Sequence, residues 1–171
     1  MAGGHLLTGA RGLAGHLGFL RSGSRSAADA GAEADVPRRF LEHRTSGSGI
    51  ARAGSAALGE ALTTRQVFAR AAAGDERAEA VLASAVEELA RALDDLRWLV
   101  DPALVALGGS VGLAPGYLGR LRAALARLEP HDPLAVVAAQ LGADAGLIGA
   151  ADLLGAGDAV GDHETTDAPD A

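Results

Sequence analysis

The sequence predicts a helix-rich α/β protein, and three observations lead to that class. Aromatic residues make up only 3% of the 171 residues, so the core has to be built from Ala, Leu and Val, which is helix-favouring material. Residues 75–100 carry apolar side chains at three- and four-residue intervals, as one buried helical stripe does. The apolar run Ala103–Leu107, a glycine turn and a further amphipathic segment then follow in the order of a βα unit.

The charge distribution argues against nucleic acid or an anionic membrane as the main partner. The net charge is −7, every basic residue is Arg, and five acidic residues lie after Gly157, where there is no Arg. The rest of the chain is therefore near neutral and has no basic cluster, whereas phosphate binding needs concentrated positive charge.

Cysteine is absent, which excludes disulfides, iron–sulfur clusters and thiolate zinc sites. No apolar stretch approaches the ~20 residues that a membrane-spanning helix requires. The N-terminus lacks a cationic start followed by a long apolar run, so it does not resemble a secretory signal. We therefore expect a cytoplasmic protein.

The first 39 residues contain few structural signals. His5-Leu6-Leu7, bounded by Gly4 and Gly9, predicts one short strand. From Arg21 to Arg39 the chain consists of Ser, Ala, Gly, Asp and Arg with almost no large apolar residue, so burial cannot offset the entropy of ordering it. We expect this segment to be a mobile loop.

Helical segments follow, and each has residue types at its ends that favour the start or end of a helix. Apolar spacing resumes at Phe40, and a first helix is expected to start at a Ser46 or Ser48 cap and run to about Leu58. The others are a helix 65–73 with Thr63 or Thr64 as its cap and Gly74 as its end, and a long helix from the Asp75 cap to Asp101. Pro102 cannot continue the long helix. Its buried stripe is expected to comprise Leu82, Val86, Leu89, Leu93, Leu96 and Val100, with Glu87 and Arg91 paired on the outer face.

The C-terminal part is predicted to form the βα unit and a last helix. Ala103–Leu107 reads as a strand covered on both faces, because it has no polar alternation. The remaining expectations are a helix marked by Leu118, Leu121, Leu125 and Leu128 and closed by Pro130, a second strand within 134–141, a helix 145–154 capped by Asp144, and a disordered acidic tail after Gly157.

Six short strings together resemble the ROK family of sugar kinases and regulators, and within it the bacterial N-acetylmannosamine kinases. They are Leu6-Leu-Thr-Gly9, Gly12-Leu-Ala-Gly-His-Leu-Gly18, Ser46-Gly-Ser-Gly-Ile-Ala51, Gly74-Asp75, the segment Gly108–Leu118 and the segment Ala145–Ala151. The resemblance covers about Gly3 to Leu154 and only the second half of such a kinase. It implies that residues 1–156 form an incomplete C-terminal lobe of an actin-like (ribonuclease H-like) ATPase fold, followed by the tail 157–171.

The resemblance also implies an activity. Family members of this branch use ATP and Mg to phosphorylate the 6-hydroxyl of N-acetylmannosamine in sialic acid catabolism, with a base Asp and a phosphate loop in the first lobe. Neither motif occurs in this sequence. Because phosphoryl transfer depends on positioning, the chain is expected to be inactive alone.

Five residues are site candidates by their match to family positions. His16 and Glu42 match sugar-contacting residues, and both side chains can hydrogen-bond to hydroxyls. Gly108, Gly109 and Ser110 match the turn beside the adenosine of ATP, where glycine leaves room for the nucleotide. The plain alternatives are a loop histidine without a ligand, a solvated Glu favoured by the dipole of a helix start, and an ordinary tight turn.

The zinc knuckle of the family is expected to be lost. Phe19 occupies the position of its His ligand and Phe40 that of its last Cys, so zinc cannot bind by that route. Two functions stay open: the sugar- and adenosine-binding half of a kinase, or a non-catalytic remnant that acts as an interaction or dimerisation module, including as a homodimer. A repressor ranks third, since the sequence shows no helix-turn-helix.

Overall fold

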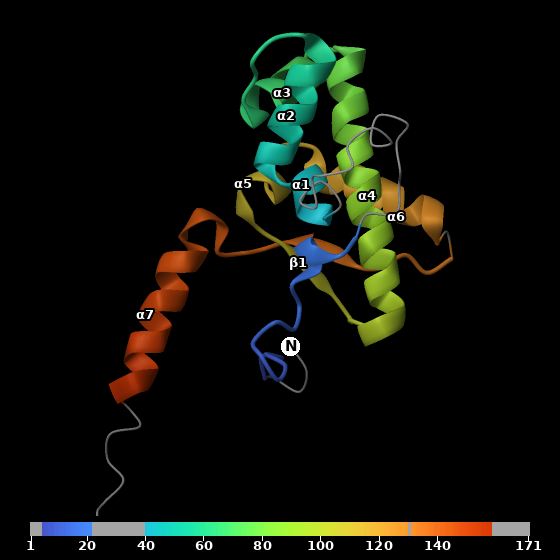
Figure 1. Cartoon of the computed structure of the whole chain (residues 1–171). Helices are drawn as coiled ribbons and strands as arrows, with labels where there is room; N and C mark the ends of the chain where they lie inside the picture. Colours follow the sequence, from blue (N-terminus) through green and yellow to red (C-terminus); the bar gives the residue numbers. More distant parts are fainter. Residues whose placement is uncertain (1–4, 22–39, 130, 159–171) are drawn as a thin grey trace, which may run out of the picture. The chain divides into compact units, whose positions relative to one another are not determined.

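The computed structural model describes residues 5–21, 40–129 and 131–158 (Figure 1). The chain divides into two compact units that meet between Ala138 and Ala139, and each is described by itself. The first unit contains η1 (Leu17–Phe19), α1 (Leu41–Thr45), α2 (Gly47–Leu58), α3 (Thr64–Ala72), α4 (Glu76–Val100), β1 (Val105–Leu107), α5 (Gly109–Gly112), α6 (Tyr117–Leu128) and β2 (Val136–Ala138). The second contains η4 (Gly142–Asp144) and α7 (Ala145–Asp158). The predicted helix-rich α/β class is confirmed.

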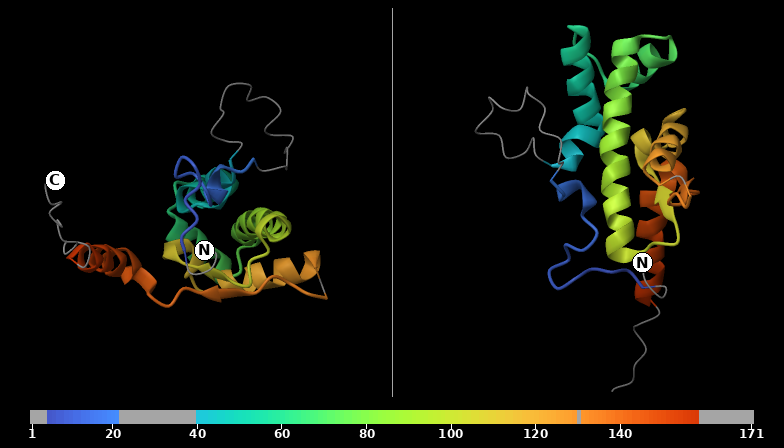
Figure 2. Two further views of the ribbon diagram at one scale, coloured as in Figure 1. Left: turned by 90° about the horizontal axis from the view of Figure 1, so that it is seen from below. Right: turned by 90° about the vertical axis from the view of Figure 1, so that its right-hand side faces the viewer.

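The long helix α4 organises the first unit, and its predicted cap is confirmed. The Asp75 carboxylate accepts hydrogen bonds from the backbone N–H groups of Arg77 and Ala78, at 2.9 and 3.2 Å. These are amides that a helix start leaves without an intrahelical partner. Helices α1, α2, α3 and α6 pack against α4 (Figure 2). The helix ends at Asp101, which is left-handed with φ 44° and directly precedes Pro102.

The caps of α2 and α3 settle two alternatives that the sequence left open. Ser46, not Ser48, caps α2, since its Oγ accepts from the Gly49 N–H at 3.2 Å. Thr63, not Thr64, caps α3 in a reciprocal capping box with Gln66. The Thr64 hydroxyl instead donates to the Gly47 carbonyl at 2.6 Å and so joins the start of α3 to the start of α2.

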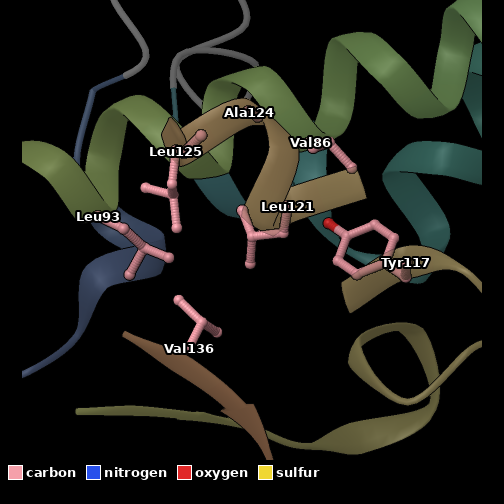
Figure 3. Close-up of a cluster of buried hydrophobic side chains, with 8 residues drawn as sticks. Val86, Leu93, Tyr117, Leu121, Ala124, Leu125 and Val136 are labelled. Atoms are coloured by element: carbon pink, nitrogen blue, oxygen red, sulfur yellow. The ribbon is translucent and has the colours of Figure 1, made fainter. Parts of the chain in front are cut away.

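One apolar cluster lies between α4, α6 and β2. Leu93 of α4, Leu121 and Leu125 of α6 and Val136 of β2 point toward one another (Figure 3). Tyr117 is 1% exposed at the other end of this cluster. The stripes that were read from the sequence of two helices therefore meet in one core.

A second cluster joins α2, α3 and α4 around Ile50, Val67 and Leu82, all of which are 0% exposed. Here α2 and α3 approach closely, because a Cβ added to Gly54 would overlap the Val67 Cγ2. Phe68 and Val111 pack against both clusters. The helical part of the unit thus has a continuous apolar interior.

The sheet is smaller than the sequence predicts. Strands β1 and β2 pair in parallel, with Val105 opposite Val136 and Leu107 opposite Ala138. The expectation that 103–107 is covered on both faces is wrong: Ala106 is exposed and Leu104 is 51% exposed. The physical reason is that, within the described residues, the sheet has only these two strands, and the helical core covers only the side of β1 that carries Val105 and Leu107.

Several further expectations need correction. Of the predicted strand His5-Leu6-Leu7, only His5 forms a β-bridge; Leu6 and Leu7 pair with no described residue, and Leu6 is 74% exposed. Val100 is 51% exposed rather than part of the buried stripe, because it lies in the last turn of α4, next to the exposed Leu99. Asp144 is the last residue of the helical turn η4 and not an extended cap of α7.

Two predicted segments lie wholly or mostly outside the described residues. Arg21 is described and forms an isolated antiparallel bridge with Phe40, but residues 22–39 of the expected mobile loop are not described. The acidic tail is likewise outside them from residue 159 onward. The helix predicted at 145–154 is present and extends to Asp158.

Candidate functional site

His16 lies in an exposed turn just before η1. Its Nδ1 is 3.1 Å from the Leu13 carbonyl oxygen, which favours the tautomer that carries a proton on Nδ1. Its ring is tilted against the Phe19 ring, with the centroids 6.0 Å apart. In that tautomer Nε2 is the nitrogen left to accept a hydrogen bond from a ligand.

Glu42 occupies the first turn of α1, beside the segment that carries His16. A Cβ on Gly18 would lie 3.2 Å from the Glu42 Cβ and 3.5 Å from its Oε2, so the carboxylate lies directly against η1. The Leu41 N–H donates to the Leu20 carbonyl at 2.9 Å and holds the two segments together. The structure therefore brings the segments of both sugar-site candidates together, and both side chains are exposed.

The glycine turn after β1 has the geometry that its residues suggest. Gly109 has φ 75°, a left-handed conformation that favours glycine. Gly112 lies against β1, since a Cβ there would come within 2.8 Å of the Leu107 Cγ. The turn continues directly into the one-turn helix α5, which the sequence reading did not predict.

A hollow of about 660 Å³ opens beside this turn, where the starts of α2 and α3 face α5. Its polar lining consists of Thr63, Thr64, Arg65 and Ser110, and its apolar lining includes Phe68, Val111 and Pro115. Small-molecule sites are typically apolar clefts with a few placed polar groups, and the hollow has both that composition and that size. Of the three predicted nucleotide-turn residues, Ser110 lines the hollow, while Gly108 and Gly109 precede it in the chain.

The sequence reading missed most of this hollow. Gly47, Thr63, Thr64, Arg65 and Phe68 line it. The sequence indicates Gly47 only as part of a family string and the start of α3 only by its capping signals. The one available signal was the pair Thr63-Thr64: a helix start needs a single cap, so the second threonine was free for another role. Nothing in the sequence placed the start of α3 beside Ser110.

The charged and titratable side chains near the hollow differ in whether they have a partner. Tyr117, which follows the lining turn, packs its ring 6.0 Å from that of Phe68, and burial raises its pKa to about 12. Three residues further along α6, Arg120 donates two hydrogen bonds to the Glu79 carboxylate, at 2.9 and 2.6 Å. Hydrogen bonding to that guanidinium lowers the pKa of Glu79. Arg65, by contrast, has no ion pair within the described part of the chain.

Among residues 5–21, 40–129 and 131–158, no three His, Cys, Asp or Glu side chains are grouped so that they could hold a metal ion. None of the helices in that part of the chain combines the length and apolar character needed to cross a membrane.

Comparisons with known proteins place these elements in a family context. A family model described as the ROK family matches residues 1–156. The chain is 42% identical over 156 residues to an N-acetylmannosamine kinase of Citrobacter koseri, covering 91% of this chain and 51% of that protein.

Solved structures give the same picture. A ROK hexokinase from Thermus thermophilus matches with a TM-score of 0.73 and 33% identity, over 91% of this chain and 53% of that one. A ROK family glucokinase from Streptomyces griseus, in complex with glucose and AMPPNP, matches with a TM-score of 0.58 and 28% identity, over 67% of this chain and 44% of that one. The chain thus spans about half the length of these relatives, and the predicted actin-like ATPase fold is confirmed.

Proposed function

The chain belongs to the ROK family, and we propose that it supplies the sugar-binding and adenosine-binding half of an ATP-dependent N-acetylmannosamine kinase. The observation that carries this proposal is the hollow at the start of α3, because it pairs the glycine turn after β1 with an apolar slot of the right size for a nucleoside. The transferred phosphoryl group would go to the 6-hydroxyl of the sugar, in sialic acid catabolism and in the cytoplasm.

The sugar would contact His16 and Glu42. A carboxylate accepts hydrogen bonds from two hydroxyls, and the imidazole Nε2 accepts one more when Nδ1 faces the Leu13 carbonyl. Gly18 supports this arrangement, because the absence of a side chain there lets the Glu42 carboxylate lie against η1. The kinase relatives of this chain are named for N-acetylmannosamine, which supports that sugar as the substrate.

The nucleotide would bind in the hollow. Phe68, Val111 and Pro115 would contact the base with their apolar side chains. The Ser110 and Thr64 hydroxyls also line the hollow and would hydrogen-bond to the ribose. The glucokinase relative solved with AMPPNP supports a nucleotide of this class. Bound ATP would supply the phosphoryl group. Mg would bind together with the nucleotide, whose phosphates supply oxygen ligands for it.

Turnover requires more than these two subsites. The base Asp and the phosphate loop of the family do not occur in the 171 residues. Without them neither the attacking hydroxyl nor the γ-phosphate is positioned, and positioning supplies most of the rate in this chemistry. The chain alone is therefore expected to bind ligands without catalysis. Steady ADP release with N-acetylmannosamine in a coupled assay would contradict that expectation.

Calorimetric titration of the full chain with N-acetylmannosamine and with ADP tests the proposal. Both ligands are expected to bind. Glu42→Gln is expected to lower the affinity for the sugar and leave that for ADP unchanged. Ser110→Glu adds a negative charge to the hollow and is expected to lower the affinity for ADP alone. His131→Ala is the matched control outside both subsites and should change neither affinity. If the wild-type chain binds neither ligand, the proposal is wrong.

One observation favours the alternative, a non-catalytic interaction or dimerisation module. Trp98, Leu99 and Val100 are 75%, 78% and 51% exposed at the end of α4, and a contiguous exposed apolar patch is typical of an interaction surface. A chain that binds no ligand but forms a concentration-dependent dimer, lost in Trp98→Ser with Leu99→Ser, would support the module instead.

A further inference from the structure

Arg65 lies at the N-terminus of α3, where its positive charge does not stabilise the helix. It lies in the first turn of α3, which contains no acidic residue. The peptide dipoles of a helix put partial positive charge at its N-terminus, so a cation there is unfavourable unless an anion compensates it. Arg65 is exposed, lines the hollow, and forms no ion pair or hydrogen bond with the part of the chain that the structure describes.

The other arginine of α3 shows the contrast. Arg70 lies in the last turn of the same helix, where a cation is favoured, and its guanidinium is 2.6 Å from the Glu60 carboxylate. The first-turn amides of α3 cannot partner Arg65 either, because a backbone N–H and a guanidinium are both hydrogen-bond donors. Arg65 thus has neither a protein partner nor a favourable field.

The residues that line the hollow indicate which kind of ligand could compensate the charge of Arg65. Its polar members besides Arg65 are hydroxyl-bearing, and no carboxylate is among them. An uncompensated guanidinium on the rim of an otherwise neutral hollow favours an anionic occupant, and its forked donors match the geometry of phosphate oxygens. A neutral nucleoside would leave the guanidinium without an anionic partner.

We propose that Arg65 is the residue that makes this hollow bind a phosphorylated nucleotide in preference to the bare nucleoside, by donating to a phosphate of the ligand. This inference rests on the proposed function, because it assumes that the hollow holds a nucleoside. Arg65 acts here as a specificity-determining residue, and the base is held independently by the apolar wall around Phe68.

The test compares adenosine with ADP as probes on the full chain, by calorimetry, for four forms of the protein: wild type, Arg65→Gln, Arg65→Lys and Arg70→Gln. Arg65→Gln is expected to lower the affinity for ADP by about 10-fold or more and to change the affinity for adenosine by less than about 2-fold. Charge-assisted hydrogen bonds to phosphate are among the stronger hydrogen bonds. Arg65→Lys keeps the charge but not the fork and should recover part of the ADP affinity. Arg70→Gln removes a charge from the same helix outside the hollow and should leave both affinities unchanged.

The outcomes separate this inference from the function on which it rests. Equal losses of adenosine and ADP in Arg65→Gln would assign Arg65 to the base or to the structure of α3 and overturn the inference. Unchanged ADP affinity would overturn it as well. If the wild-type chain binds neither probe, the nucleotide role of the hollow fails, and the inference fails with it. Circular dichroism of each variant checks that α3 and its neighbours stay folded.

Discussion

The helical region around α4 and the region formed by the N-terminal segment and the two-stranded sheet differ in how completely they bury their apolar residues. In the first, Ile50, Leu82 and Leu121 are 0% exposed. In the second, Leu6 and Leu104 are 74% and 51% exposed. Helices complete their hydrogen bonds internally and need only pack against one another, whereas a strand needs neighbours on its edges and cover on its faces. The helical region therefore buries its apolar residues mainly between its own helices and Val136 of β2, whereas the other region leaves much of its apolar surface exposed.

Truncating one leucine in each region is expected to give the largest difference. Leu121→Ala removes a fully buried side chain between α4 and β2 and should lower the free energy of unfolding by about 2–5 kcal/mol. Leu104→Ala, at a half-exposed position, should change it by less than about 0.5 kcal/mol. Urea unfolding of both variants checks this, and equal losses would show that the sheet region is as well packed as the helices.

Two glycines in helices test how tightly the helical region is packed. Gly54→Ala should cost about 1–3 kcal/mol of stability, because its Cβ would overlap Val67. Gly119→Ala, in α6 with open space around the new Cβ, should instead stabilise by about 0.5–1 kcal/mol. Thermal unfolding of the pair measures the difference. A stable Gly54→Ala protein would mean that α2 and α3 are less close than the structure shows.

Tyr117 reports the same packing without a mutation, because it is the single tyrosine of the chain. Burial raises its pKa from 10.0 to about 12, so the folded protein holds the phenol proton where the unfolded chain has lost it. Stability from this group is complete below pH 10.0 and is lost as the pH rises through about 12. Tyrosinate absorbance during alkaline titration checks this, and a midpoint near 10.0 would show that Tyr117 is accessible to solvent.

The smallest expected effect concerns the Glu79–Arg120 pair, which joins α4 to α6 at a half-exposed position. Hydrogen bonding to Arg120 lowers the pKa of Glu79 below 4.5 in the folded state, so the pair stabilises the protein above that pH and the effect is lost on acidification. Glu79→Gln should cost less than about 1 kcal/mol at neutral pH, because solvent screens the pair. Wild type and variant should converge in acid, and a constant difference down to low pH would assign the loss to packing.

The helices were predictable from sequence, and the hollow was not. A helix cap depends only on residues close in the sequence, so it can be predicted locally. The structure confirms Asp75 as a cap, and it selects Ser46 over Ser48 and Thr63 over Thr64. The predicted strand at Leu6 and Leu7 was wrong because a strand depends on a distant neighbour, which no described residue supplies. The approach of Arg65 to Ser110 is likewise a tertiary fact between segments far apart in the chain. The sugar and nucleotide roles of the candidate residues stay predictions.

We expect the helical region, together with Val136 of β2, to hold its structure by itself. The N-terminal segment and the rest of the sheet are expected to need the half of the kinase fold that the matched relatives have in addition. Hydrogen exchange of the full chain tests this expectation most directly, because local stability is read amide by amide. We expect the strongest protection in α4, the weakest in residues 5–21, and low protection in β1 and β2 of the chain alone. A monodisperse monomer in which the amides of residues 5–21 are protected as well as those of Glu76–Val100 would contradict it.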